Sequence, residues 1–355
     1  MTATATEIDT ATETATAAPG TAVRVRLPVN EDVTTRAYQF YAFPVSIIEA
    51  HDPAKVEWTL TNFIHLAYDQ RPDTPVPMCF YLFDYTANPH LETLRTDAEL
   101  MHELLGARLA AFAARQLAQG WYLYLNVDEQ HIPRRYAFGR KRMSHDLLVH
   151  GFDAEAGTVD VLGYDETAAF RSVTIPAGAL DTAFAEHRAL GSGCRQFVLY
   201  RYRPRSTFAF DRGFVAGEIR TYLRSENPTA ALRALREPWD RVYGLAVWDC
   251  LARELAAARA GEREYDHRSV RVLFEHSSLM LDRIRLLLAD DPAAAEEATR
   301  AYRPVVRFCR SLGFAVLAAA NAGDHSCLDR LTGEFAGVTD RHAAVLRALV
   351  GPDAP

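Results

Sequence analysis

The chain has 355 residues, which is enough for two domains of roughly 150 residues, each with its own hydrophobic core. It contains 46 acidic and 39 basic residues, a formal net charge of −7, and this balance argues against a nucleic-acid-binding protein. A hydrophobic share of 49% is typical of soluble globular proteins. No apolar run approaches the ~20 residues of a membrane helix, and the N-terminus lacks the basic and apolar regions of a secretory signal. We therefore expect a cytoplasmic protein.

Five cysteines are spread along the chain without a CxxC pair. Such an odd, dispersed set fits a reducing compartment, where most thiols pack as small hydrophobic groups. Clustered residues at metal-ligand spacing and glycine-rich phosphate loops are both missing from the sequence. We therefore expect neither a metal site nor a cofactor. The cysteines are Cys79, Cys194, Cys250, Cys309 and Cys327.

The first half of the chain predicts an α+β domain. Residues 1–21 are a low-complexity run of Ala and Thr, which predicts a disordered tail, and alternation from Val23 predicts the first strand. Hydrophobic spacing then predicts helices over 52–69 and from Thr96 to Gly120, the second opened by a Thr96–Glu99 capping box, and strands over 78–85, 121–128, 145–152, 157–164 and 195–201. The four-residue connection 153–156 makes two of these strands a hairpin.

From about Phe210 the hydrophobic period becomes helical. Helical segments are expected over 211–224, 228–235, 240–258, 268–289, 293–319 and 325–349. The organisation is therefore an α+β domain over residues 22–205 followed by an all-helical bundle over 206–350. The junction 202–207 is short and lacks a Gly/Ser-rich run, so we expect the bundle to pack against the first domain.

The segment from Gly120 to Asp165 contains the candidate catalytic residues. Asp128 ends one predicted strand, His145 opens the next, and Asp165 follows the third. Strand ends present polar side chains to a cleft, so these three residues are expected to converge. A histidine beside a carboxylate is the usual arrangement of a general base, because the carboxylate orients the ring and stabilises its protonated form.

This segment resembles the butirosin biosynthesis protein H N-terminal family, which has a papain-like fold, and more distantly the bacteriocin-processing cysteine peptidases. The shared pattern is a strand ending in Asp128, a loop with Ile132–Pro133, His145 opening a strand that ends in Gly151–Phe152–Asp153, and a hairpin leading to Asp165. About 45 residues carry the pattern, within a resemblance that covers residues 30–350. The helical half is similar to the helical region attached to that family.

The resemblance implies acyl transfer from a carrier-protein thioester to an amine, in a bacterial natural-product pathway. It also implies a Cys nucleophile at the N-terminus of the first helix, where the helix dipole lowers the pKa of a thiol. The helix expected over 52–69 opens at Asp52 and Pro53 and contains no Cys. The nearest thiol, Cys79, lies in an apolar strand-like run and is interpreted as a buried structural residue.

We therefore predict a papain-like acyltransferase or cyclase without a Cys nucleophile. His145 is the expected general base, and Asp165 or Asp128 is expected to orient it. The expected partners are an acyl or peptidyl carrier protein and a small amine or peptide substrate, with no nucleic acid and no membrane. Residues expected to contact the substrate are Glu129, Tyr164, Glu275 and His276.

Two alternatives remain open from the sequence. The chain fits a non-catalytic papain-like partner of a biosynthetic enzyme, because the nucleophile is missing. It also fits a hydrolase with an unrecognised nucleophile, either Cys79 or a hydroxyl at Ser46, Thr59 or Thr61. His145 and Asp165 also have plain structural interpretations, as a strand-edge residue and as the start of a turn.

Overall fold

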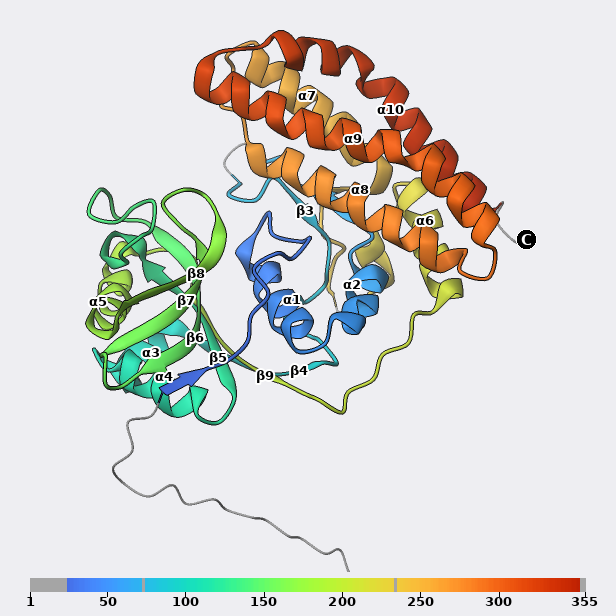
Figure 1. Cartoon of the computed structure of the whole chain (residues 1–355). Helices are drawn as coiled ribbons and strands as arrows, with labels where there is room; N and C mark the ends of the chain where they lie inside the picture. The colour runs from blue at the N-terminus through green and yellow to red at the C-terminus, as the bar shows by residue number, and fades with distance from the viewer. Residues whose placement is uncertain (1–23, 72–73, 233–234, 352–355) are drawn as a thin grey trace, which may run out of the picture.

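The chain folds into a mixed α/β structure with an antiparallel sheet in its N-terminal part and helices in its C-terminal part (Figure 1). The computed structural model describes residues 24–71, 74–232 and 235–351. The expected disorder of residues 1–21 therefore lies outside the described residues.

The main sheet is antiparallel throughout, in the order β4-β9-β5-β6-β7-β8, and β1 extends it by pairing with the far end of β6. The β6–β7 hairpin contains an irregularity between Val149 and Gly151. The strands are β1 (Arg24–Arg26), β4 (Leu91–Asp97), β5 (Trp121–Asp128), β6 (Ser144–Asp153), β7 (Thr158–Tyr164), β8 (Phe170–Pro176) and β9 (Gln196–Tyr202).

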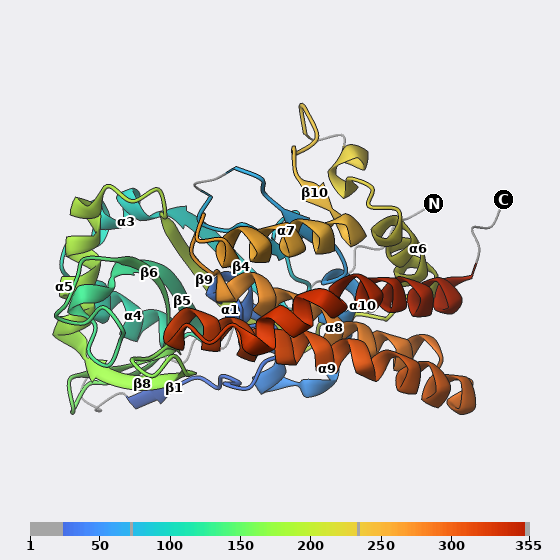
Figure 2. The same cartoon turned by 90° about the horizontal axis from the view of Figure 1, so that it is seen from above.

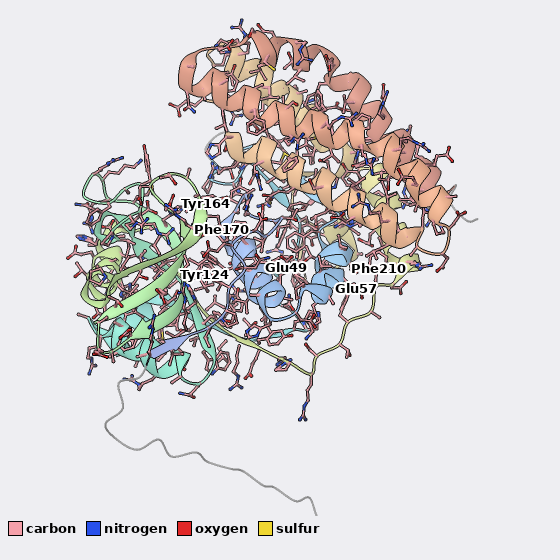
Figure 3. All side chains as sticks on the ribbon, viewed as in Figure 1. Glu49, Glu57, Tyr124, Tyr164, Phe170 and Phe210 are labelled. Atoms are coloured by element: carbon pink, nitrogen blue, oxygen red, sulfur yellow. The ribbon has the colours of Figure 1, made fainter. Side chains whose placement is uncertain are left out.

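Two apolar layers cover the two faces of this sheet. Strand β5 shows why, because its side chains alternate between the faces. Tyr122 and Tyr124 belong to the core shared with α1 (Gln39–His51), whereas Leu123 and Leu125 belong to the core on the opposite face. That opposite core is covered by α3 (Ala98–Leu105), α4 (Leu109–Leu117) and α5 (Ala177–His187). Figure 3 shows Tyr124, Tyr164 and Phe170 on the side of the sheet that faces α1.

A small second sheet, in the order β10-β2-β3, packs against α7 and α8, and Figure 2 shows β10 beside α7. Its strands are β2 (Leu66–Tyr68), β3 (Met78–Phe80) and β10 (Val242–Tyr243). The remaining helices are α2 (Val56–Asn62), α6 (Arg212–Leu223), α7 (Val247–Arg259), α8 (His267–Leu287), α9 (Pro292–Ala322) and α10 (Ser326–Val350). Single 3-10 turns are η1 (Pro53–Lys55), η2 (Glu129–His131), η3 (Arg188–Leu190), η4 (Pro228–Ala231) and η5 (Gly244–Ala246).

Helix α8 joins the helical region to the N-terminal part. The buried guanidinium of Arg283 donates to the carbonyl oxygens of Leu60 and Phe63 at the end of α2. Unpaired carbonyls at a helix end need such donors, so Arg283 completes α2 from outside. The hydrophobic core on this side runs continuously from α1 and α2 into α7–α10. The two parts of the chain are therefore packed on one shared core.

The helix expected over 52–69 is confirmed only in its first part, where η1 and α2 lie, and the rest of the range is not helical. The first helix is α1, and it ends at His51 because Asp52 caps the next turn, with its side chain accepting from Ala54 N at 3.1 Å. The end of the expected helix is strand β2, paired with β3. Helix α1 escaped detection because nearly all its side chains are buried and it contains Pro44, so its sequence has no amphipathic period.

Several other boundaries also differ from the expectation. The cap of α3 is Asp97, whose carboxylate accepts from Glu99 N at 2.8 Å, and not Thr96. The single helix expected up to Gly120 is two helices, since the chain turns at Gly106 with φ +54°. Among the described residues of segment 228–235 the structure has the 3-10 turn η4 and no α-helix, and β4, β8 and α5 were not expected.

Helix α9 is long and apolar enough to cross a membrane by length and composition, the one such helix among the described residues. It packs along α8 and α10, and it exposes Phe314 and Leu317 on its outer face.

Candidate functional site

The loop between β5 and β6 brings a carboxylate and a histidine together. Strand β5 ends at Asp128 and η2 begins at Glu129, while His145 is the second residue of β6. The two strands stay paired up to Asp128 and Ser144, and Glu129 N donates to Met143 O at 2.8 Å to close the loop. Glu129 and His145 are therefore held at the two ends of one loop by the sheet itself.

The Glu129 carboxylate contacts Nδ1 of His145 directly. An ionised carboxylate only accepts hydrogen bonds, so Nδ1 carries the proton and the lone pair lies on Nε2. The Glu129 side chain is 3% exposed, whereas that of His145 is 35% exposed. The imidazole is thus fixed by a buried partner and still partly open to solvent.

Gln39, the first residue of α1, faces the other side of the ring. Its amide nitrogen lies 3.3 Å from Nε2 of His145 and donates to Asp146 O at 3.2 Å. Its amide oxygen accepts from Tyr164 N at 3.1 Å. Because two backbone groups fix the orientation of the amide, the second N–H of Gln39 points toward the lone pair of His145.

Gly163 on β7 makes room for this arrangement. Its φ is +153°, a conformation that L side chains rarely adopt. A Cβ at this position would collide with the amide oxygen of Gln39 and with the guanidinium of Arg135. Only glycine therefore allows Gln39 and Arg135 to lie together against β7.

The Glu129 carboxyl stays ionised despite its burial. Burial is the largest influence and raises its pKa, but the His145 ring, the Ala137 N–H at 2.9 Å and the charge of Arg135 together bring the pKa below its ordinary value. Arg135 is 3% exposed and donates to the carbonyl of Tyr164. Burial lowers the pKa of Arg135 to about 10, so it remains a cation at neutral pH.

Neither of the two expected aspartates contacts His145. Asp128 accepts from Arg142 Nε at 2.8 Å, Met143 N at 3.1 Å and Gln130 N at 3.2 Å, and it caps η2. The structure therefore corrects the expected orienting residue from Asp128 to its neighbour Glu129.

Asp165 is also engaged elsewhere. It accepts from Thr167 N at 2.8 Å and Ala169 N at 3.0 Å, and it pairs with Arg171. These bonds shape the turn between β7 and β8. Asp165 therefore takes the turn-forming place that its sequence also allowed.

Tyr164 and Glu275 are connected to the cluster through Arg36. The Tyr164 hydroxyl donates to Arg36 O at 2.6 Å, while Glu275 accepts from Arg36 N at 2.9 Å and from Arg271 Nε at 2.7 Å. Burial raises the pKa of Tyr164 to about 12, so its hydroxyl is neutral. Tyr164 and Glu275 thus fix the segment that leads into Gln39.

His276 lies in a different place. It is fully buried beside Tyr222 and Phe80, and its Nε2 lies 3.0 Å from Ile64 O. Burial is the main reason that its pKa lies well below the usual value. The structure therefore places His276 in the core of the helical region and not with Glu129 and His145.

The residues considered as nucleophiles are either hydrogen-bonded to the backbone or buried. Ser46 donates to Asn30 O at 2.6 Å and Thr61 to Glu57 O at 2.8 Å. Thr59 is buried, and burial raises the pKa of the Cys79 thiol to about 11. In the described part of the chain, no group of three His, Cys, Asp or Glu residues has the geometry to hold a metal ion.

Two surface cavities lie away from the cluster. One of about 420 Å³ is lined by α7 and α10, including Leu255 and Phe335. The other, of about 620 Å³, is lined by the segment 26–31 together with Glu49 and His150. His145 lines neither of them.

Sequence reasoning missed Gln39, Gly163 and Arg135, and it assigned Glu129 to the substrate and not to the histidine. Gln39 was missed because its helix was not expected, although the position of Glu129 directly after Asp128 gave a usable signal. No family model matches the chain, and no curated protein matches it. The chemistry is therefore argued from the cluster alone: a carboxylate-oriented imidazole with its basic nitrogen at the start of a helix.

Proposed function

We propose that the protein is an acyl-transfer enzyme of natural-product biosynthesis that joins an aminoacyl or peptidyl thioester to an amine, or cyclises it, in the cytoplasm. The observation that supports this most is the Glu129–His145 contact, with Nε2 of the ring directed at the start of α1. A partly open histidine held by a buried carboxylate is suited to accept a proton from an attacking nucleophile.

The resemblance noted in the sequence agrees with this placement. In the butirosin biosynthesis protein H N-terminal family, the nucleophilic Cys lies at the N-terminus of the first helix. The first helix here is α1, and the residue that faces the histidine from its start is Gln39. We infer that Gln39 stands where that family has its thiol, so that no covalent acyl-enzyme forms there.

Transfer then proceeds directly from thioester to amine. The amine displaces the Gln39 amide from the lone pair of His145, and its nitrogen attacks the thioester carbonyl. His145 takes the amine proton on Nε2, and Glu129 stabilises the resulting imidazolium. The carbon–sulfur bond breaks, and the leaving thiolate receives that proton. Holding both reactants in place lowers the activation free energy by up to ~7–11 kcal/mol. The acyl donor is an acyl or peptidyl carrier protein.

One observation favours a second candidate function, a non-catalytic partner of a biosynthetic enzyme. The Gln39 amide is held by Asp146 O and Tyr164 N, and it covers the lone pair that a general base needs. If this contact persists in solution with substrates present, His145 only supports the loop.

The experiment is an amide-forming assay with aminoacyl thioesters of N-acetylcysteamine and a panel of amines, followed by mass spectrometry. Glu129→Gln keeps the size of the side chain and removes its charge, so amide formation should fall by at least ~10²-fold. His131→Ala is the matched control. His131 lies in the same loop, but its Nε2 is 4.0 Å from Asp128 Oδ2 and it is not part of the Glu129–His145 pair. No amide from wild type would support the non-catalytic candidate instead, whereas equal rates for wild type and Glu129→Gln would overturn the role proposed for Glu129.

A further inference from the structure

The loop that joins Glu129 and His145 is unusually basic for this chain. Residues 134–142 read RRYAFGRKR, with five basic residues and no acidic one, in a protein of net charge −7. The loop also contains Tyr136 and Phe138, whose side chains are 56% and 47% exposed. Large exposed aromatic groups between cations are a costly surface for a monomer and point to a contact with another molecule.

The buried residues of this loop hold it against Glu129, beside His145. Arg135 and Ala137 are buried, whereas Arg134, Tyr136 and Phe138 alternate with them and are exposed. Ala137 N donates to the Glu129 carboxylate, and Gly139 N donates to Gln130 O at 2.9 Å. The inner side of the loop thus holds Glu129, and its outer side presents aromatic and basic groups a few residues from His145.

Two cations of the loop are not neutralised. Arg134 pairs with Glu166, and Arg142 pairs with Asp128 and Glu186. Arg140 and Lys141 are exposed and have no carboxylate within ion-pair distance among residues 24–71, 74–232 and 235–351. Both lie over the Tyr136 ring, at 5.9 Å and 5.1 Å from its centroid. The outer side of the loop is therefore a positive surface built around one aromatic ring.

We propose that this outer side, formed by Tyr136, Phe138, Arg140 and Lys141, is the docking surface for an acidic protein that delivers the acyl group to His145. The inference rests on the proposed function, and it specifies where the carrier protein binds and what charge its contact face has. Arginine and aromatic residues are enriched in protein interfaces, and complementary charge speeds the encounter of the partners.

Other occupants fit the surface less well. A small anion would need a cradle of converging donors, whereas Arg140 and Lys141 are exposed side chains grouped on a ring. A second copy would bring this basic loop against its own copy where the loop lies on the two-fold axis, and like charges would repel there. A nucleic acid would meet a chain that is acidic as a whole.

The test measures binding of the full-length protein to a purified acidic acyl carrier protein and a purified acidic peptidyl carrier protein, at low and high salt and without turnover. The charge-reversal variant Arg140→Glu/Lys141→Glu should weaken binding to at least one of them about tenfold or more at low salt, and remove most of its salt dependence. Tyr136→Ala should weaken the same binding at both salt concentrations, because it removes buried contact area.

The matched control is Arg307→Glu/Arg310→Glu, which makes the same change in charge on exposed positions of α9. It should bind like wild type. Failure of both carrier proteins to bind, or equal binding by the loop variant, overturns the docking surface. So does loop-dependent binding of inorganic pyrophosphate or of a single-stranded RNA, or loop-dependent self-association in sedimentation. His145→Ala should still bind the carrier protein, so a failure of the proposed chemistry leaves this readout intact.

Discussion

Two histidines in this molecule have opposite surroundings. His145 is partly exposed, with a carboxylate on one nitrogen and an amide on the other. His342 on α10 is fully buried between two tyrosine hydroxyls, with Tyr222 3.0 Å from Nε2 and Tyr302 2.8 Å from Nδ1. Trp248 then donates to the Tyr222 hydroxyl at 2.9 Å.

The difference shows what decides whether a histidine can exchange protons. Burial lowers the pKa of His342 to about 3, and no carboxylate among its described partners stabilises a charged ring. His342 therefore stays neutral, and its two hydrogen bonds connect α10 to α6 and α9. His145 is partly exposed and has an ionised carboxylate on Nδ1, so a substrate can reach a ring whose orientation is fixed.

The largest expected effect is on catalysis at His145. His145→Ala should lower amide formation by ~10²–10⁴-fold, because the general base is lost. The protein should stay folded, with the free energy of unfolding lowered by about 1–3 kcal/mol, because the buried Glu129 carboxylate loses one of its partners. Parallel rate measurements and urea titrations check both parts. Normal turnover by a purified, folded His145→Ala protein would remove His145 from the mechanism.

The reverse pattern is expected at His342. His342→Ala leaves a cavity and two buried hydroxyls without their partner, so the free energy of unfolding should fall by about 3 kcal/mol. Catalysis by the remaining folded protein should match wild type. Urea titration of His342→Ala beside His131→Ala, which changes a partly exposed loop histidine, separates this loss from the general effect of removing an imidazole. If the free energy of unfolding fell as little as for His131→Ala, the hydrogen bonds of His342 would not be important for stability.

The buried histidines should also make the fold sensitive to acid. In the unfolded chain His342 titrates near its ordinary pKa of 6.5, whereas in the folded chain its pKa is about 3. As the pH falls below 6.5 the unfolded state takes up the proton first, so stability is complete above that pH and declines toward pH 3. The slope is at most about 1.4 kcal/mol per pH unit for each such histidine, and His276 adds to it.

His342→Gln keeps hydrogen-bonding groups at this position but cannot be protonated. Urea unfolding over this pH range should therefore show a shallower decline for His342→Gln than for wild type. Equal slopes in the two proteins would mean that His342 is already protonated in the fold or does not become exposed on unfolding.

The sequence predicted four strands of the main sheet closely, whereas it missed β4 and β8 and the first helix. Strands β5, β6, β7 and β9 lie within a residue or two of their expected bounds, because alternation of apolar side chains is a local signal. Helix α1 is buried on all sides, so its sequence carries no amphipathic pattern, and it was missed. The error moved the expected first helix from Gln39 to Asp52.

That error also determined what could be predicted of the site. His145 was identified from its place at a strand start, but its partners depend on the tertiary fold. Glu129 reaches the ring because η2 turns the chain immediately after β5, and Gln39 arrives from a helix about 100 residues earlier in the chain. Neither contact follows from periodicity or spacing.

The smallest expected effect concerns the cysteines. Three of the five are buried, and burial raises the pKa of each, to about 11 for Cys79 and about 12 for Cys309, with Cys250 raised as well. A thiol reacts as its thiolate, so these three should resist alkylation in the folded protein. Iodoacetamide should modify Cys194, which is exposed, and to a lesser extent Cys327. Neither residue contacts the Glu129–His145 cluster.

Alkylation should therefore leave amide formation unchanged, in contrast to the loss expected for His145→Ala. Peptide mapping by mass spectrometry identifies the modified thiols, and the transfer assay on the same sample measures the consequence. Inactivation that follows modification of Cys79 in a one-to-one ratio would restore a covalent mechanism. The chemistry would then depend on a thiol in β3, whereas the structure directs the basic nitrogen of His145 toward the first residue of α1.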